Sequence, residues 1–168
     1  MSQGTRWLGE NFLLTSLQEQ PEVLTVQVSG GSDQDEHVKL SFFGTVSMGR
    51  VGEPETTEDE VLQVASLDDL MATKVKVVLQ RIEVKDYQDI AELVRADVSL
   101  AKGLAAARAM YGHDFQPSEA LKAMVYFEGG DLHSLSRADQ KTLIKAVIEV
   151  RDLPSAAIAS RTLMSMEA

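Results

Sequence analysis

The segment from residue 66 to residue 90 constrains the fold of this chain more than any other. At about 100° per residue, the apolar side chains between residues 67 and 82 form one broad helical arc. Ser66 is placed as the N-cap of this helix, with Asp69 as its capping-box partner. A second apolar stripe at helical spacing follows from residue 86. The segment therefore predicts two consecutive helices that meet at a corner.

Four charged residues interrupt this apolar pattern. Lys74 and Arg81 fall inside the arc of the first helix. Asp86 falls within the stripe of the second helix, and Asp89 lies on its edge. Charges on a core-facing stripe cost free energy unless they are paired with opposite charges or serve a functional site. We therefore expect these four side chains to converge where the two helices meet, whereas Lys76 points away to water.

The pattern leaves two interpretations of this cluster open. In the first, it is a structural ion network: Arg81 pairs with Asp86 or Asp89, and Lys74 extends its apolar stem so that its charge reaches water. In the second, the corner forms a cleft for a phosphate-bearing ligand. Lys74 and Arg81 would then supply the cations, and a carboxylate would orient them.

The remaining pattern divides the chain into a strand-rich part and a helical part. Residues 23–29 and 37–43 alternate apolar and polar side chains, which predicts an antiparallel hairpin. We also expect a short helix at residues 11–18 and short strands at residues 45–51 and 61–65. Helices are predicted from residue 66 onward, at residues 67–81, 100–111, 117–127 and 137–150, with Ser136 and Asp139 as a second capping box.

These elements predict an α+β fold. A small, mainly antiparallel sheet in residues 1–65 is expected to form a partial α/β core, and residues 66–168 form the helical region. We expect both parts to make one compact domain, because 168 residues can bury one substantial core.

Several motifs resemble those of the nucleotidyl transferase AbiEii/AbiGii toxin-like family. They are VASLDDLMATK at residues 64–74, Arg81, and KDYQDI at residues 85–90, in the family's order and spacing. The resemblance extends to VKLSFFG at residues 38–44 and to two downstream segments, and it covers residues 13–163. It implies a small nucleotidyltransferase core followed by helices. It also implies transfer of a nucleotide from an NTP with a divalent metal such as Mg²⁺.

The chain departs from this family at the metal site. The family holds its metal with a Gly-Gly/Ser turn followed by an Asp-x-Asp strand near the N-terminus. Here the single Asp-x-Asp, Asp33 and Asp35, lies in a glycine-rich loop, and Ser41 stands where a further carboxylate is expected. We interpret the chain as a truncated or degenerate family member without transferase activity by itself. No catalytic residue and no metal ligand is assigned.

The resemblance nevertheless supports a retained nucleotide or phosphate pocket. Lys74, Arg81 and Lys85 would contact phosphates, while Asp86 and Asp89 would orient these cations. Mg²⁺ and an NTP are implied if the protein is active. One alternative is an active metal-dependent toxin whose start lies upstream or whose site is completed by another chain. The other is a structural or interaction domain without a ligand.

Composition narrows the expected partners and location. Residues 1–65 hold 11 acidic and 3 basic residues, and the whole chain has a net charge of −10. General electrostatic binding to nucleic acid is therefore not expected. The sequence has no long apolar run, so we expect a cytoplasmic protein that does not enter a membrane. An antitoxin protein and self-association through an open sheet edge are further expectations.

Overall fold

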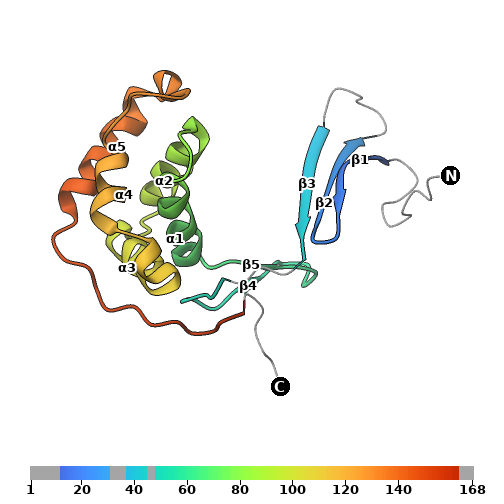
Figure 1. Cartoon of the computed structure of the whole chain (residues 1–168), viewed down its shortest axis with the longest axis horizontal. Coiled ribbons are helices and arrows are strands. Elements are labelled where there is room, and N and C mark those ends of the chain that lie inside the picture. Colours follow the sequence, from blue (N-terminus) through green and yellow to red (C-terminus); the bar gives the residue numbers. More distant parts are fainter. Residues whose placement is uncertain (1–11, 31–36, 45–47, 163–168) are drawn as a thin grey trace. The chain divides into compact units, whose positions relative to one another are not determined.

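The computed structural model describes residues 12–30, 37–44 and 48–162 (Figure 1). Its contacts divide the chain into two compact units, residues 1–46 and residues 47–168. The first unit contains a three-stranded antiparallel sheet, and the described part of the second contains five α-helices and a two-stranded ribbon. The fold is therefore α+β, as the sequence predicted. The contacts place the division between residues 46 and 47, so the ribbon belongs to the helical unit.

The sheet has the strand order β1-β2-β3, with strands β1 (Phe12–Gln20), β2 (Val23–Gly30) and β3 (His37–Phe43). Strands β2 and β3 form the predicted hairpin, with Val26 opposite Leu40. The short helix predicted at residues 11–18 is wrong, because residues 12–20 form β1 and pair antiparallel with β2. Only two residues separate β1 from β2, so β2 offers the preceding segment a ladder of backbone hydrogen bonds.

The helical unit begins with the ribbon of β4 (Glu55–Thr56) and β5 (Gln63–Val64). The helices follow in sequence, and α1 packs against α3 and α2, whereas α2 packs against α5. Two short 3-10 helices, Gly112–Asp114 and Leu132–Ser134, flank α4. The helix bounds are α1 Leu67–Val77, α2 Val84–Arg95, α3 Leu100–Tyr111, α4 Pro117–Ala123 and α5 Arg137–Glu149.

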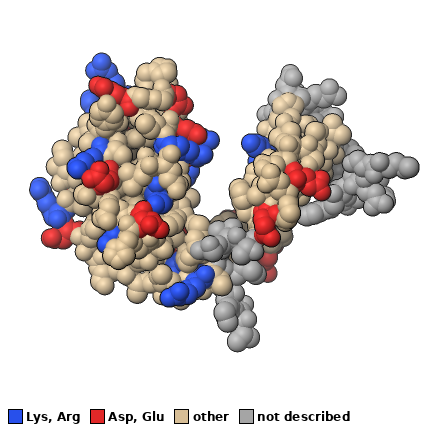
Figure 2. Space-filling model, in the orientation of Figure 1, with Lys and Arg blue, Asp and Glu red and all other residues tan. Residues whose placement is uncertain are grey.

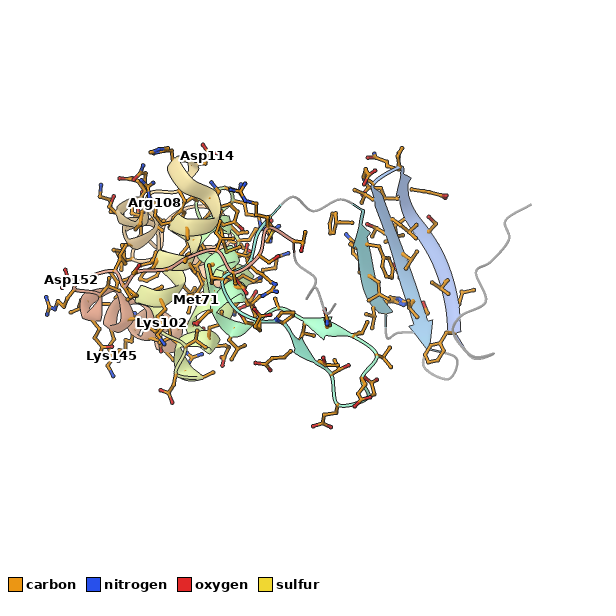
Figure 3. All side chains as sticks on the ribbon, turned by 90° about the horizontal axis from the view of Figure 1, so that it is seen from below. Met71, Lys102, Arg108, Asp114, Lys145 and Asp152 are labelled. Carbon is orange, nitrogen blue, oxygen red and sulfur yellow. The ribbon has the colours of Figure 1, made fainter. Side chains whose placement is uncertain are left out.

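The core of this unit lies between the helices. Figure 3 shows Met71 among the helices, whereas Arg108, Asp114 and Lys145 lie at the periphery. Met71 is completely buried, and α3 approaches α1 closely at Gly103: a Cβ atom there would lie 2.1 Å from Met71 Cγ. The largest fully buried side chains include Tyr87, Phe115, Met71, Ile90 and Leu104.

Helix ends differ from the predictions in two places. Helix α1 ends at Val77, one turn before the predicted residue 81. Beyond it the backbone N–H groups of Leu79 and Gln80 bond three residues back, to Lys76 and Val77, which tightens the turn. Helix α4 likewise ends at Ala123 rather than near residue 127. Helices α3 and α5 agree with their predicted ranges, and Ser136 caps α5 as predicted.

Two further expectations concern a strand after β3 and the absence of a membrane-spanning segment. A strand was expected at residues 45–51; residues 45–47 lie outside the described part, and Arg50 forms an isolated bridge with Ser160. Among the helices described, none is long and apolar enough to cross a membrane.

Candidate functional site

The end of α1, the turn after it and the first turns of α2 bring the four predicted charges together. The carboxylate of Asp86 accepts a hydrogen bond from Lys74 Nζ at 3.3 Å. It also accepts two from Arg81, one from Nε at 2.8 Å and one from a terminal guanidinium nitrogen at 3.2 Å. Lys74 Nζ donates a further bond of 2.5 Å to Asp89. Asp86 is therefore the shared acceptor of both cations.

Exposure differs sharply within this cluster. The side chain of Asp86 is completely buried, whereas those of Lys74 and Arg81 are 24% and 46% exposed. Asp89 is about half exposed. The cluster thus has a buried anionic centre and cationic groups that reach solvent. We name the four residues Lys74, Arg81, Asp86 and Asp89 the α1–α2 corner.

The electrostatics of the corner favour the charged forms of Lys74, Arg81 and Asp86. Burial disfavours the ammonium of Lys74, but hydrogen bonds and attraction from Asp89 and Asp86 outweigh burial and raise its pKa. Burial also disfavours the charged form of Asp86, yet the hydrogen bonds from Arg81 and Lys74 prevail and lower the pKa of this carboxyl. The hydrogen bond to Asp86 raises the pKa of Arg81. The corner is therefore a set of true ion pairs.

The two other lysines of the segment lie differently. Lys85 is 62% exposed and pairs with Glu83 at 3.0 Å, so it stands at the rim of the corner. Glu83 also approaches the Arg81 guanidinium at 3.6 Å. Lys76 points away from the corner: its Nζ donates to the carbonyl oxygen of Asp114 and lies 5.5 Å from the centre of the Tyr111 ring.

A buried carboxylate that the sequence assigned only to helix capping has a wider role. Asp69 accepts hydrogen bonds from the backbone N–H groups of Val51 and Gly52, at 2.7 and 3.1 Å, and from the hydroxyl of Ser66. It thereby fastens the loop before β4 to the start of α1. A Cβ atom on Gly52 would lie 2.2 Å from Ser66 Oγ, so this close approach requires glycine.

The corner adjoins a hollow in the surface. Arg81 lines a pocket of about 540 Å³ together with the rest of the α1–α2 turn, helix α4 and Tyr126. Sequence reasoning missed this pocket because it expected helices through both residue 81 and residue 126. Tyr126 lies after the end of α4, and its side chain is 60% exposed.

The carboxylates of the corner do not fit a magnesium site. Mg²⁺ requires carboxylate and other oxygen ligands in near-octahedral geometry. Both oxygens of Asp86 accept bonds from Lys74 or Arg81, and Asp89 accepts one from Lys74. Within the described ranges, no three acidic, histidine or cysteine side chains gather to hold a metal ion. Asp33 and Asp35 lie outside those ranges, and Ser41 on β3 shares a hydrogen bond of 3.1 Å with Thr25.

The charge on the surface of the helical unit is mixed. Figure 2 shows lysine and arginine side chains interspersed with aspartate and glutamate on the visible face of this unit. A corner that gathers two cations around one buried carboxylate is thus a local feature. Any anion binding there would depend on the geometry of these side chains rather than on the field of a basic surface.

The fold and this corner define an α+β protein with a cationic site at the start of its helical region. A comparison with known families matches residues 8–160 to the family described as nucleotidyl transferase AbiEii toxin, type IV TA system. The match spans most of the chain, so this protein belongs to the AbiEii family. Comparisons with curated proteins and with solved structures found no match.

Proposed function

We propose that this chain binds a nucleoside triphosphate through Lys74 and Arg81 and does not transfer the nucleotide by itself. One observation carries the proposal: two partly exposed cations share a single carboxylate that is completely buried. Asp86 holds the two positive groups close together, where they would otherwise repel each other, without itself facing an incoming anion.

The donors of the corner suit phosphate oxygens. A guanidinium carries five N–H donors and an ammonium three, and Arg81 uses two of its donors for Asp86. Charge-assisted bonds to phosphate are shorter and stronger than neutral ones. Asp89 is half exposed, so a phosphate oxygen can replace it on Lys74 while Asp86 keeps both cations in place. Lys85 at the rim is paired with Glu83 but is largely exposed, so its remaining N–H donors can reach an arriving phosphate.

We propose the absence of nucleotide transfer because this sequence offers no suitable set of carboxylate ligands for a catalytic metal ion. In the sequence its single Asp-x-Asp, Asp33 and Asp35, follows Gly30, Gly31 and Ser32 and is not part of an alternating apolar run. The two carboxylates of the corner are bonded to cations. The family is described as a type IV toxin–antitoxin system, so we also propose an antitoxin protein as a partner.

Self-association through the sheet remains a prediction. In the described sheet β1 and β3 are both edge strands, and Phe12, Leu40 and Phe42 are 52%, 39% and 47% exposed. Unpaired edges and exposed apolar faces favour association. Light scattering at high protein concentration is the measurement, and a monomer there would contradict this expectation.

Calorimetric titration with the four NTPs, with and without Mg²⁺, tests the proposed function. We expect binding that Lys74→Ala weakens at least tenfold. Lys76→Ala is the matched control, because Lys76 lies on the same helix but contacts Asp114 and Tyr111. Heat that is unchanged by Lys74→Ala, or no heat with any NTP, would contradict the proposal.

The stability of Lys74→Ala separates a binding role from a structural one. Lys74 is paired with both Asp86 and Asp89, but it is partly exposed, and Arg81 remains on Asp86 after the substitution. We expect a loss of about 1 kcal/mol in the free energy of unfolding. A loss of several kcal/mol with unchanged NTP binding would make Lys74 a structural residue.

A further inference from the structure

The pocket that Arg81 lines is partly apolar and lies beside the α1–α2 corner. Val78, at its base, is 3% exposed. Three larger apolar side chains stand around it and remain partly open to solvent: Leu79, Ile82 and Tyr126 are 38%, 47% and 60% exposed. At about 540 Å³ the pocket has the size of a small-molecule site.

We propose that this pocket holds the nucleobase of the NTP whose phosphates bind Lys74 and Arg81, with the base stacked on the ring of Tyr126. The inference rests on the proposed function and adds the place of the base. Arg81 links the two parts, since it both bonds Asp86 in the corner and lines the pocket. If the phosphates of a nucleotide bind at the α1–α2 corner, its base can lie in the adjoining pocket.

The chemistry of the walls suits a purine or pyrimidine ring. Aromatic side chains offer stacking faces to bases of any sequence, and the exposed ring of Tyr126 lines the pocket together with the apolar side chains of Val78, Leu79 and Ile82. Gln80, on that turn, carries an amide that can both donate to and accept from a base edge. Glu119 and Lys122 pair with each other at 2.9 Å on the remaining side.

The wall formed by the α1–α2 turn is held in place by the loop after α4. Asp131 accepts a hydrogen bond of 2.7 Å from the backbone N–H of Val84, at the start of α2. Gly130 packs against the same turn so closely that a Cβ atom would lie 2.3 Å from the carbonyl oxygen of Ile82. Because this wall is fixed before any ligand arrives, binding requires little ordering of the turn.

The test compares an NTP with methyl triphosphate, which is also a triphosphate monoester but has neither ribose nor base, so the Tyr126 variants decide whether base stacking accounts for a difference. We expect calorimetry to show that the wild-type chain binds the tightest of the four NTPs about tenfold more tightly than methyl triphosphate. Tyr126→Ala should remove this difference and leave methyl triphosphate binding unchanged. Tyr126→Phe, which keeps the ring, should retain the difference.

The outcomes separate this inference from the proposed function. Equal affinity of the wild-type chain for the NTP and methyl triphosphate would overturn the base pocket alone. So would a Tyr126→Ala variant that keeps the full preference for the NTP. If methyl triphosphate does not bind while Tyr126→Ala still abolishes NTP binding, the phosphate role of the corner fails and the base pocket stands. Circular dichroism of Tyr126→Ala confirms its folding, and the exposed side chain should tolerate the change.

Discussion

Helix α2 has an ion-paired region at each end, and the two regions share their charges in opposite ways. At its start, one buried carboxylate, Asp86, accepts bonds from two cations, Lys74 and Arg81. At its end, one cation, Arg95, bonds two carboxylates, those of Glu92 and Asp139. The first region has two cations per central carboxylate, and the second has two carboxylates per central cation.

This difference separates a candidate binding site from a structural contact. Arg95 and Asp139 connect α2 with α5, two helices that pack on each other, and Asp139 also accepts from the hydroxyl of Ser136, the N-cap of α5. An arriving anion would meet carboxylates that already occupy the arginine. At the α1–α2 corner the carboxylate that the two cations share is buried, and an anion would have to replace only the half-exposed Asp89 on Lys74. The two ends of α2 therefore differ in how they would meet an anion.

Removing Asp86 should have the largest effect on stability. Asp86→Ala leaves Lys74 and Arg81 close together without their shared acceptor, and we expect a loss of about 3 kcal/mol in the free energy of unfolding. Urea unfolding measures this loss. Methyl triphosphate binding should also weaken, because the two cations are no longer held together. A loss below about 1 kcal/mol would show that Asp86 does not organise the corner.

Removing Asp139 should have a smaller effect and no effect on binding. Asp139→Ala breaks the ion pair with Arg95 and the bond from Ser136, but Arg95 is partly exposed and keeps Glu92. We expect a loss of about 1–2 kcal/mol by the same urea measurement. Affinity for methyl triphosphate should equal that of the wild type. Weaker binding of methyl triphosphate by this variant would contradict the claim that only the start of α2 takes part in binding.

The pH dependence of stability should be the smallest of the three effects and should appear at both ends of α2. Arg81 and Lys74, prevailing over burial, lower the pKa of Asp86 in the folded state. Its contribution is therefore present above the ordinary aspartate pKa of about 4. It is lost as the pH falls through the lowered folded value. Between about pH 5 and pH 3, Asp86→Ala should lose less stability than the wild type.

Asp139 allows the same pH measurement at the other end of α2. The hydrogen bond from Arg95 lowers the pKa of Asp139 as well. The stability of Asp139→Ala should therefore also fall less steeply than that of the wild type as the pH decreases. In the double variant Asp86→Ala/Asp139→Ala the two reductions should add, because the sites lie at opposite ends of α2. Parallel pH curves for the wild type and Asp86→Ala would show that the ion pairs of Asp86 do not favour its charged form.

The α1–α2 corner could be predicted because its signal is local. Lys74, Arg81 and Asp86 lie within a stretch of 13 residues. Helical periodicity placed Lys74 and Asp86 on faces that meet, whereas Arg81 reaches Asp86 from the turn after α1. The apolar arc itself was only partly right, since Leu67 is 49% exposed while Met71 and Val75 form the buried face. Periodicity gives the direction of a side chain but not which elements cover it.

Contacts between distant segments could not be predicted in this way. Arg95 and Asp139 lie 44 residues apart, and the sequence pattern assigned Asp139 only to the capping box of its own helix. Asp69 binds the backbone of Val51 and Gly52, and no side-chain pattern reports a backbone donor. The strand β1 was missed because it depends on pairing with β2, and its own apolar residues fit a helix as well. Tertiary pairing decided these three features.

Backbone NMR of the chain titrated with methyl triphosphate tests the central claim most directly. We expect chemical-shift changes in amide groups around Lys74, Arg81 and Asp86, at the α1–α2 corner. Amide groups around Arg95 and Asp139 should remain unchanged and serve as the internal control. Shifts of equal size at both ends of α2, or none at the corner at saturating ligand, would contradict the claim that sharing one buried carboxylate makes the two cations a phosphate site.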